Sequence, residues 1–268
     1  MSLSLATKLQ STACIIPLLF AVQTSAATIL FDDDFQDTAV SAPTSQADLN
    51  VGVAVGTWTV TTLEESFVQL ALDGADHVLT MDQGNFDITA NFAQESTLAL
   101  EPKISMEVGL RRRSGNNKHN FIDGFDADDN RLFSIRLNGD EDSNSNEVAY
   151  STDGSTYTDL EGGLVWQAPA VNSTNMKLVE IALDATGWDL WFDADDDGTM
   201  DAGEFTTDLS FIASPTAGLT TLQFTGESSA GARVDDILAS QVPEPSSLAI
   251  AVLGGLIGLI GFGRRRKR

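Results

Sequence analysis

The sharpest candidate for chemistry is a run of closely spaced carboxylates over residues 193–204, with the sequence DADDDGTMDAGE. The spacing matches the calcium-loop pattern D-x-D-x-D-G followed by five residues and a glutamate. Carboxylates this close repel one another, and a hard divalent cation relieves the repulsion with the oxygen ligands that it prefers. The sequence therefore predicts a Ca²⁺ site, with Gly198 permitting the sharp turn of the loop.

The loop resembles an EF-hand loop in its ligand spacing and differs from it in its surroundings. Residues 188–192 before it and 205–211 after it alternate like strands and do not form helical patterns. The alternative is an acidic, solvated hairpin loop that holds no metal. By the resemblance, the predicted ligands are Asp193, Asp195, Asp197, Thr199 through its carbonyl, Asp201 through a water molecule, and Glu204.

Aromatic side chains are the residues that could stack on a sugar, and the candidates are Trp58, Trp166, Trp188 and Trp191. On a strand, Trp188 shares one face with Leu190 and Phe192, which indicates a core face. Trp191 then lies on the other face between two aspartates. It is either a stacking platform or an aromatic packed under a neighbouring loop.

Enzymatic signals are few. His77 and His119 stand alone, and the sequence has no G-x-S-x-G, no H-E-x-x-H and no compact pair of glutamates spaced as in sandwich-fold glycosidases. We therefore expect a protein without catalytic activity. The alternative is a secreted polysaccharide-active enzyme that uses buried carboxylates of the same domain.

The elements that must position these residues are strands. Apolar residues alternate with period two in segments such as 67–72, 104–110, 132–137 and 178–183, and turn-forming clusters separate these segments at intervals of about ten residues. This pattern predicts an all-β fold, a two-sheet antiparallel sandwich that occupies residues 28–241 as one domain. Two acidic stretches, 123–130 and 193–198, lie between strand-like runs, and we interpret them as hairpin loops.

Three short segments, 125–133, 188–193 and 232–237, resemble parts of a laminin-G or concanavalin-like jelly roll. The resemblance implies that the first and last strands lie together and can share a structural calcium. Five aspartates would then form a second candidate metal site, or else serve as edge-strand charges that discourage aggregation. They are Asp32, Asp33, Asp34, Asp235 and Asp236.

The predicted domain is strongly acidic. Residues 28–241 contain 38 acidic and nine basic side chains, a net charge of −29. Such a surface repels nucleic acid and anionic lipid and attracts divalent cations, although solubility alone would also explain it. The one basic cluster, residues 111–113, could contact an anionic polysaccharide or form salt bridges at a strand end.

The first 27 residues predict a secretory signal peptide. Lys8 precedes a short apolar run over residues 13–22, and small residues at 24–27 supply a cleavage site. The apolar run is too short to span a bilayer comfortably. Cys14, the only cysteine, lies within this segment, so the exported domain would contain no disulfide.

The last 27 residues combine three features in order. Val242, Pro243, Glu244 and Pro245 precede a glycine-rich apolar run, which five basic residues then follow. The run predicts a short transmembrane helix over residues 247–263 with its basic end in the cytoplasm. Residues 242–268 resemble the PEP-CTERM sorting signal, which implies recognition by an exosortase, a membrane transpeptidase. An ordinary anchor that is never cut is the alternative.

Together these features predict an exported protein of the cell surface or extracellular matrix, anchored transiently in the membrane and sorted by exosortase. Its sandwich would be stabilised by calcium and would bind glycan, with exopolysaccharide as a candidate partner. No nucleic-acid partner is expected, given the net charge.

Overall fold

The computed structural model describes residues 26–35, 46–63, 68–73, 76–81, 86–111, 119–139, 146–160, 176–195, 197–226 and 231–242. Residues Ala26–Glu244 form one compact unit. The predicted signal peptide, except its last two residues, and the predicted sorting tail beyond Val242 lie outside the described residues, as does the predicted helix 247–263. Within the described ranges, no helix has the length and hydropathy of a membrane span.

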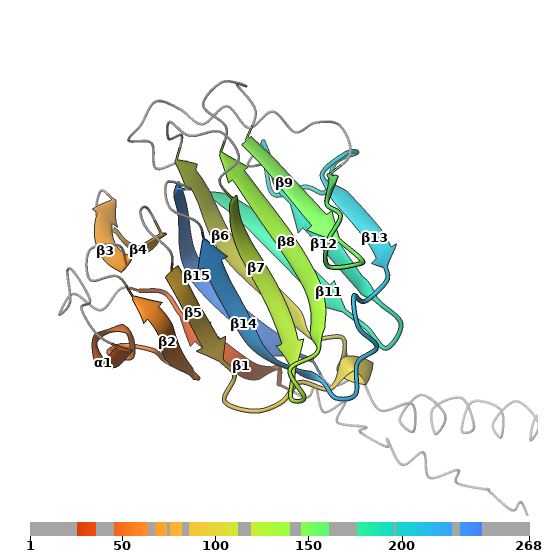
Figure 1. The fold of residues 1–268 in the computed structure, drawn as a ribbon, viewed down its shortest axis with the longest axis horizontal. Helices are drawn as coiled ribbons and strands as arrows, with labels where there is room; N and C mark the ends of the chain where they lie inside the picture. Colours follow the sequence, from red (N-terminus) through yellow and green to blue (C-terminus); the bar gives the residue numbers. More distant parts are fainter. Residues whose placement is uncertain are drawn as a thin grey trace, which may run out of the picture. The chain divides into compact units, whose positions relative to one another are not determined.

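The larger of two antiparallel sheets has eight strands (Figure 1). Its order is β13-β12-β11-β6-β15-β4-β3, and β1 also pairs with β15. The strands are β1 (Thr28–Asp33), β3 (Val68–Asp73), β4 (Asp76–Met81), β6 (Lys103–Arg111), β11 (Lys177–Leu183), β12 (Trp188–Phe192), β13 (Phe205–Leu209) and β15 (Gly231–Gln241).

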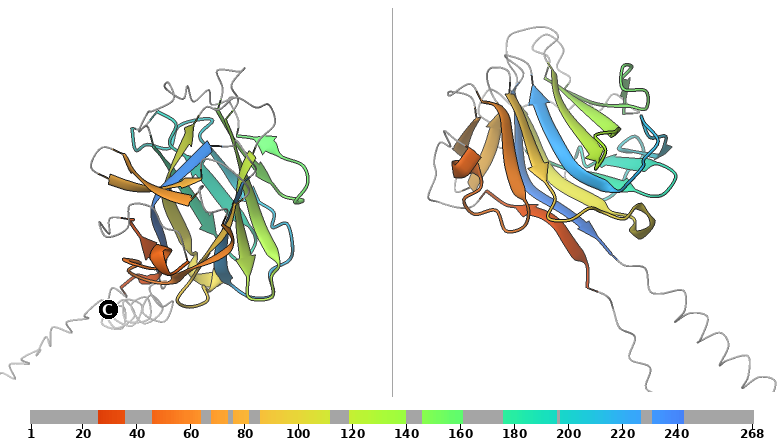
Figure 2. Two further views of the ribbon diagram at one scale, coloured as in Figure 1. Left: turned by 60° about the vertical axis from the view of Figure 1, so that its left-hand side comes forward. Right: turned by 60° about the horizontal axis from the view of Figure 1, so that its bottom comes forward.

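The second sheet has seven strands in the order β10-β9-β8-β7-β14-β5-β2. They are β2 (Thr57–Leu63), β5 (Phe86–Asn91), β7 (His119–Asp126), β8 (Arg131–Gly139), β9 (Asn146–Ser151), β10 (Thr158–Asp159) and β14 (Leu219–Gly226). Two short helical segments, α1 (Gln46–Leu49) and η1 (Leu98–Leu100), lie in connections. Figure 2 shows the two sheets as stacked layers. The predicted two-sheet antiparallel sandwich is confirmed.

The core fills the space between the sheets, as the alternation of apolar residues predicts. In β11, Val179, Ile181 and Leu183 are buried while the residues between them are partly exposed. In β12, Trp188, Leu190 and Phe192 are buried, which confirms their assignment to the core face. Burying each such side chain contributes about 1.5–3 kcal/mol, so the alternating strands can adopt only one orientation.

The first and last strands of the domain pair with each other. Thr28 of β1 lies opposite Gln241 of β15, so the chain enters and leaves the sandwich at the same end. Gln241 is buried, and its Oε1 accepts a hydrogen bond of 2.8 Å from the Thr97 N–H. The next residue, Val242, is 56% exposed. Strand β15 thus ends two residues before Pro243, the first residue of the Pro-Glu-Pro motif.

The interpretation of residues 123–130 as a hairpin loop was wrong for their first half. Residues 123–126 belong to β7, and only the last four form the turn to β8. Asp126 is buried and accepts hydrogen bonds from the Asp128 and Asn130 N–H groups and from Thr216 in a distant loop. Desolvation alone would raise the pKa of Asp126, but a further hydrogen bond from the Asn130 side-chain amide, at 3.0 Å, together with these bonds outweighs it and lowers the pKa to about 2. Asp126 is therefore a structural acceptor.

Candidate functional site

The acidic loop of residues 193–204 connects β12 to β13, so strands flank it as the sequence predicted. It brings three carboxylates together: one oxygen each from Asp193, Asp195 and Asp197 lies within 4.8 Å of the others. Asp193 is buried, whereas Asp195 and Asp197 are exposed. Gly198 has φ +73°, in the left-handed region that favours glycine, and it turns the chain back toward Asp193.

Hydrogen bonds to the backbone shape this loop. The two oxygens of Asp193 accept from the N–H groups of Asp197, at 3.2 Å, and Gly198, at 2.9 Å. The Oε1 of Glu204, also buried, accepts from the Ala194 N–H at 2.9 Å. The first and last predicted ligands thus close the loop at its base.

The remaining predicted ligands are placed differently. Thr199 donates its N–H and its hydroxyl to Asp197, and Asp201 is exposed and donates its N–H to the Oε2 of Glu204 at 3.2 Å. In the described part of the chain, the three-aspartate group does not include Asp201 or Glu204. The structure therefore gathers Asp193, Asp195 and Asp197 and leaves the other three at the rim or base of the loop.

The carboxylates of the loop affect one another's protonation. Partial desolvation and then the nearby charges of Asp197, Glu204 and Asp193 raise the pKa of Asp195. The hydroxyl and N–H of Thr199 lower the pKa of Asp197. A bound cation would offset both the desolvation and the repulsion that raise the pKa of Asp195. Oxygen donors at this spacing fit Ca²⁺, which takes six to eight oxygen ligands.

The second candidate metal site does not assemble in the same way. Strands β1 and β15 do lie together, but Asp33 points into the core, where its Oδ2 accepts a 2.6 Å hydrogen bond from the Trp58 indole. The Oδ1 of Asp235 accepts from the Asp236 N–H. None of the five aspartates belongs to a metal-sized group of acidic side chains within the described ranges. Asp33 instead links the two sheets.

Trp191 lies on the outward face of the eight-stranded sheet and is partly buried. Its neighbours across the strands are Glu180 and Phe205, and Phe205 is 40% exposed. Within the described residues, the Trp191 indole N–H is buried without a hydrogen-bond partner. Trp166 lies outside the described residues. Of the three described tryptophans, only Trp191 offers a partly exposed ring. Sequence reasoning missed a more regular polar surface on the other sheet.

That surface is a pocket of about 330 Å³ on the outward face of the seven-stranded sheet, which we call the polar trough. Its residues alternate with core residues such as Trp58, Ile88 and Phe224, so their side chains point away from the core. Two cross-strand rows build it, over β2, β5, β14 and β7. The lining residues are Thr59, Thr89, Asn91, Phe125, Asp129, Thr221 and Gln223.

The trough offers both hydrogen-bond donors and acceptors. Asn91 donates its amide N–H to Thr59 Oγ1 at 2.9 Å, and Gln223 donates its amide N–H to Asp87 at 2.7 Å. In the described structure the amide oxygens of these two residues have no partner, and neither do the hydroxyls of Thr89 and Thr221. These groups are available to a ligand.

The two arginines of the seven-stranded sheet, both on β8, are paired with acidic side chains, and Arg131 is the one that lies opposite the trough residue Phe125. Arg131 lies 3.8 Å from Asp123 and donates to the Gly154 carbonyl at 2.8 Å. Arg136 lies 3.6 Å from Asp159 and stacks over the Tyr157 ring at 5.0 Å. Neither arginine lines the trough.

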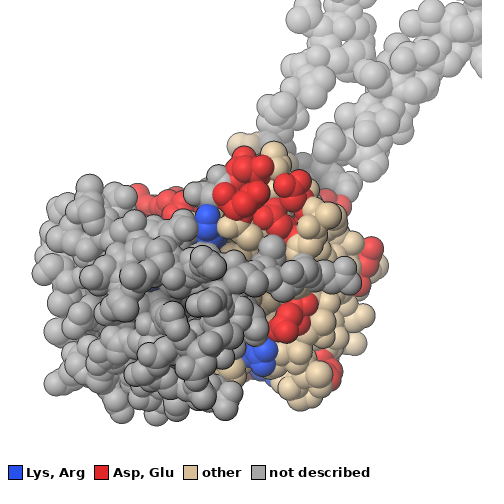
Figure 3. All heavy atoms as spheres, turned by 90° about the horizontal axis from the view of Figure 1, so that it is seen from above, with Lys and Arg blue, Asp and Glu red and all other residues tan. Residues whose placement is uncertain are grey.

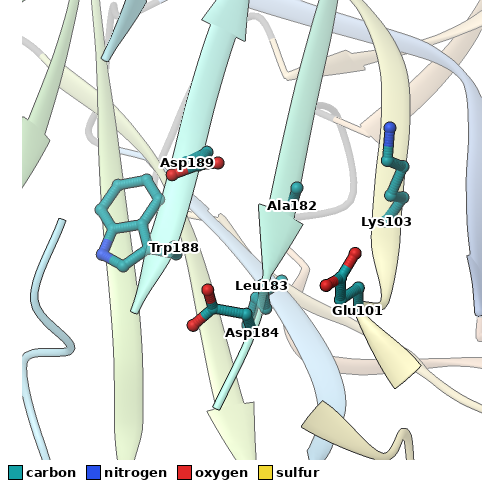
Figure 4. Close-up of a pocket in the computed structure, with 7 residues that line it drawn as sticks. All are labelled: Glu101, Lys103, Ala182, Leu183, Asp184, Trp188 and Asp189. Carbon is teal, nitrogen blue, oxygen red and sulfur yellow. The ribbon is translucent and has the colours of Figure 1, made fainter. Parts of the chain in front are cut away.

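A second, smaller pocket of about 140 Å³ lies at the turn between β11 and β12 (Figure 4). Glu101, Lys103, Asp184 and Asp189 contribute its charged groups. Asp184 accepts from the Thr186 and Gly187 N–H groups of the turn, and Asp189 accepts from the Asp208 N–H at 2.8 Å. Because these two carboxylates already stabilise backbone, we interpret this pocket as structural.

On the face drawn in Figure 3, the red patches of Asp and Glu side chains are larger than the blue patches of Lys and Arg. His119 lies on β7 with its ring against Phe121, while the side chains of His77 and of the predicted basic cluster at 111–113 lie outside what the structure describes.

Comparison with known proteins identifies the tail and gives distant matches for the sandwich. A family described as a PEP-CTERM protein-sorting motif matches residues 241–267, which points to export and a cell-surface or extracellular location. No curated protein sequence matches the chain.

Three solved structures illustrate the structural matches. The globular domain of T. cruzi calreticulin has 12% identity, covers 86% of this chain and 95% of its own, and has a TM-score of 0.44. Domain 4 of AbnA, an extracellular arabinanase from Geobacillus stearothermophilus in complex with arabinotriose, has 13% identity, coverages of 82% and 96%, and a TM-score of 0.47. The CBM2 module of the evolved Dit of Lactobacillus casei BL23 phage J-1 has 11% identity, coverages of 82% and 98%, and a TM-score of 0.47.

Proposed function

We propose that this exported protein is a cell-surface or matrix component that exosortase sorts and that binds glycan in the polar trough. The observation that carries the glycan part is the lining of the trough: five uncharged hydrogen-bonding side chains beside one aromatic ring, Phe125. A sugar presents hydroxyl groups at its edge and C–H groups on its ring faces. Ligand sites combine apolar surface with a few placed polar groups, and their volumes begin at about 300 Å³.

Calcium has a separate, stabilising role in this proposal. Asp193, Asp195 and Asp197 would hold the ion, with Glu204 at the base of the loop. The ion would supply positive charge, which offsets the desolvation and the repulsion from neighbouring carboxylates that together raise the pKa of Asp195. The loop joins β12 to β13 at the edge of the eight-stranded sheet, whereas the trough lies on the seven-stranded sheet. Calcium therefore stabilises the fold and does not contact the glycan.

The alternative function, a polysaccharide-active enzyme, has one observation in its favour. Asp123 is buried on the same face, and desolvation raises the pKa of its carboxyl despite Ser134 and Arg131. A glycosidase of the two-carboxylate type needs a second carboxyl group within about 5–10 Å. The cross-strand neighbours of Asp123 are Ser134 and Gln223, neither of which is acidic. The acidic Asp87 lies one strand beyond Gln223 and already accepts a hydrogen bond from its amide, and Asp123 is paired with Arg131. The binding function is therefore the better supported of the two.

Substitution of Phe125 by alanine tests the glycan site. We expect the Phe125→Ala variant to bind polysaccharide at least tenfold more weakly than the parent, because the trough loses the one aromatic side chain among its described lining residues, worth roughly 1.5 kcal/mol or more on burial. Affinity electrophoresis against a panel of polysaccharides measures the effect, with thermal unfolding as a check on folding.

The matched control is Phe205→Ala, which removes an exposed phenylalanine beside Trp191 on the other sheet. It should leave the affinity unchanged. Loss of binding in the Phe205 variant but not in the Phe125 variant would place the glycan on the Trp191 face instead.

Sorting makes a prediction about the mature C-terminus. Mass spectrometry of protein released from the cell surface should find a terminus within residues 243–247. Cleavage further upstream would have to open β15, which is paired with β1 up to the buried Gln241. Recovery of only those chains that retain Arg268 would show an uncut anchor, and a terminus before Gln241 would show that β15 is not protected.

A further inference from the structure

We infer that the ligand of the polar trough is an uncharged glycan, one whose sugar units carry hydroxyl groups but no carboxylate or sulfate. The inference rests on the proposed glycan-binding function and specifies its ligand. It follows from three features of the described structure: the absence of a cation from the trough lining, the pairing of the nearby arginines, and the placement of Asp129.

The first feature is the chemistry of the lining. Of the seven residues that line the trough, five end in a hydroxyl or a carboxamide and one is aromatic. The seventh, Asp129, is the only charged side chain among them, and it is anionic. Recognition of carboxylate or sulfate groups normally uses arginine or lysine, whose charged hydrogen bonds repay the desolvation of the anion. The described trough has no such donor.

The second feature is the state of the two arginines in this sheet. Arg131 is held by Asp123 and the Gly154 carbonyl, and Arg136 by Asp159 and the Tyr157 ring. An anionic sugar at Arg131, the arginine opposite Phe125, would compete with Asp123 for the guanidinium. A displaced carboxylate at Asp123 would be left buried without its cation, which is costly.

The third feature is the placement of Asp129. It lies in the turn between β7 and β8 and is exposed. Its φ is positive, 59°, and its backbone N–H donates to the Asp126 carbonyl, which holds the turn in place. A carboxylate at this rim accepts hydrogen bonds from sugar hydroxyls but repels an anionic group. Screening acts over about 8 Å at physiological salt, so this nearby charge affects a ligand in the trough more than the distant acidic surface does.

The size of the trough adds a detail about the ligand. Its lining spans β2, β5, β14 and β7, four strands that lie about 4.8 Å apart, so the trough extends about 14 Å across the sheet. This length accommodates more than one sugar unit. The ligand is therefore a segment of a neutral chain that crosses the strands.

The test compares one polymer in two charge states. The full-length protein in mild detergent is titrated with polyuronates and with the same polymers after chemical reduction of their carboxyl groups, alongside neutral polysaccharides, in calcium-free buffer at low and high salt. At least one carboxyl-reduced polymer should bind, and we expect its affinity at low salt to be at least tenfold higher than that of its charged parent. Its affinity should change less than twofold with salt.

The variant for this test is Asp129→Asn, which removes the charge but keeps the shape, and asparagine tolerates a positive φ. Asp129→Asn should bind the charged parent more tightly than the unmodified protein does, which reduces the difference in affinity between the charged and the reduced polymer. Phe125→Ala should weaken the binding of the reduced polymer. Tighter binding of the charged parent, with a steep loss at high salt, would overturn the neutral-glycan inference and leave glycan binding intact. Failure of every polymer to bind would overturn the proposed function itself.

Discussion

Replacement of Trp58 by alanine is expected to lower the free energy of unfolding by about 4 kcal/mol or more. The side chain is fully buried and packs against Phe31, Phe35 and Phe224 with ring centroids 5.2–5.9 Å apart. Truncating a buried tryptophan typically costs about 3–5 kcal/mol through lost transfer energy and the cavity that remains. The Asp33 carboxylate would also lose its indole donor at 2.6 Å, a loss of about 1–3 kcal/mol for a buried acceptor.

Two further variants separate these causes. Trp58→Phe retains most of the apolar volume and removes the indole N–H, so its cost measures the hydrogen bond to Asp33. Trp191→Ala makes the same truncation at a partly exposed site and should cost less than half as much. Urea unfolding of the full-length protein, followed by fluorescence, gives the midpoints. Equal destabilisation by Trp58→Ala and Trp191→Ala would show that Trp58 does not join the two sheets as described.

The sequence predicted the sandwich because the alternation of apolar and polar residues shows which side of each strand is buried. Residues 178–183 alternate in sequence, and β11 spans Lys177–Leu183 with the apolar residues inside. The acidic loop was also predictable, since its aspartates are close in the chain and its flanking strands alternate. The role of Asp126 was not predictable, because the group that distinguishes a structural aspartate from a loop aspartate is Thr216, 90 residues away.

The polar trough was missed for a related reason. Thr59 and Gln223 belong to strands far apart in the chain, and only the register through Thr89 brings them into one row. A pattern can predict that such residues point outward, but it does not show which strands are neighbours. One signal was present in the sequence. The runs TWTVTT and LTTLQFTG place uncharged polar residues at the outward positions of an otherwise acidic chain, which sets this face apart from an ordinary solvated one.

Calcium is expected to raise the melting temperature of the protein by about 5–10 °C at a concentration near 100 times its Kd. A ligand that binds only the folded state then adds about 2.7 kcal/mol. In a domain of this size, each kcal/mol corresponds to about 2–4 °C. The physical cause is the group formed by Asp193, Asp195 and Asp197, whose mutual repulsion and desolvation raise the pKa of Asp195 in the calcium-free state. Sodium chloride at matched ionic strength should give a much smaller rise, because it only screens.

The Asp195→Asn variant should change the stability of the protein in opposite directions without and with calcium. A carboxyl group whose pKa is raised by folding opposes folding at neutral pH, so removing its charge should slightly increase stability without calcium. The same change removes a ligand and should abolish most of the calcium increment. Asp195 suits this purpose better than Asp193, which is buried and holds the loop through two backbone N–H groups.

The matched control is Asp129→Asn, which changes an exposed aspartate in another turn and should respond to calcium as the parent does. If Asp195→Asn keeps the full calcium response, the loop is an acidic hairpin and the stabilising cation binds elsewhere.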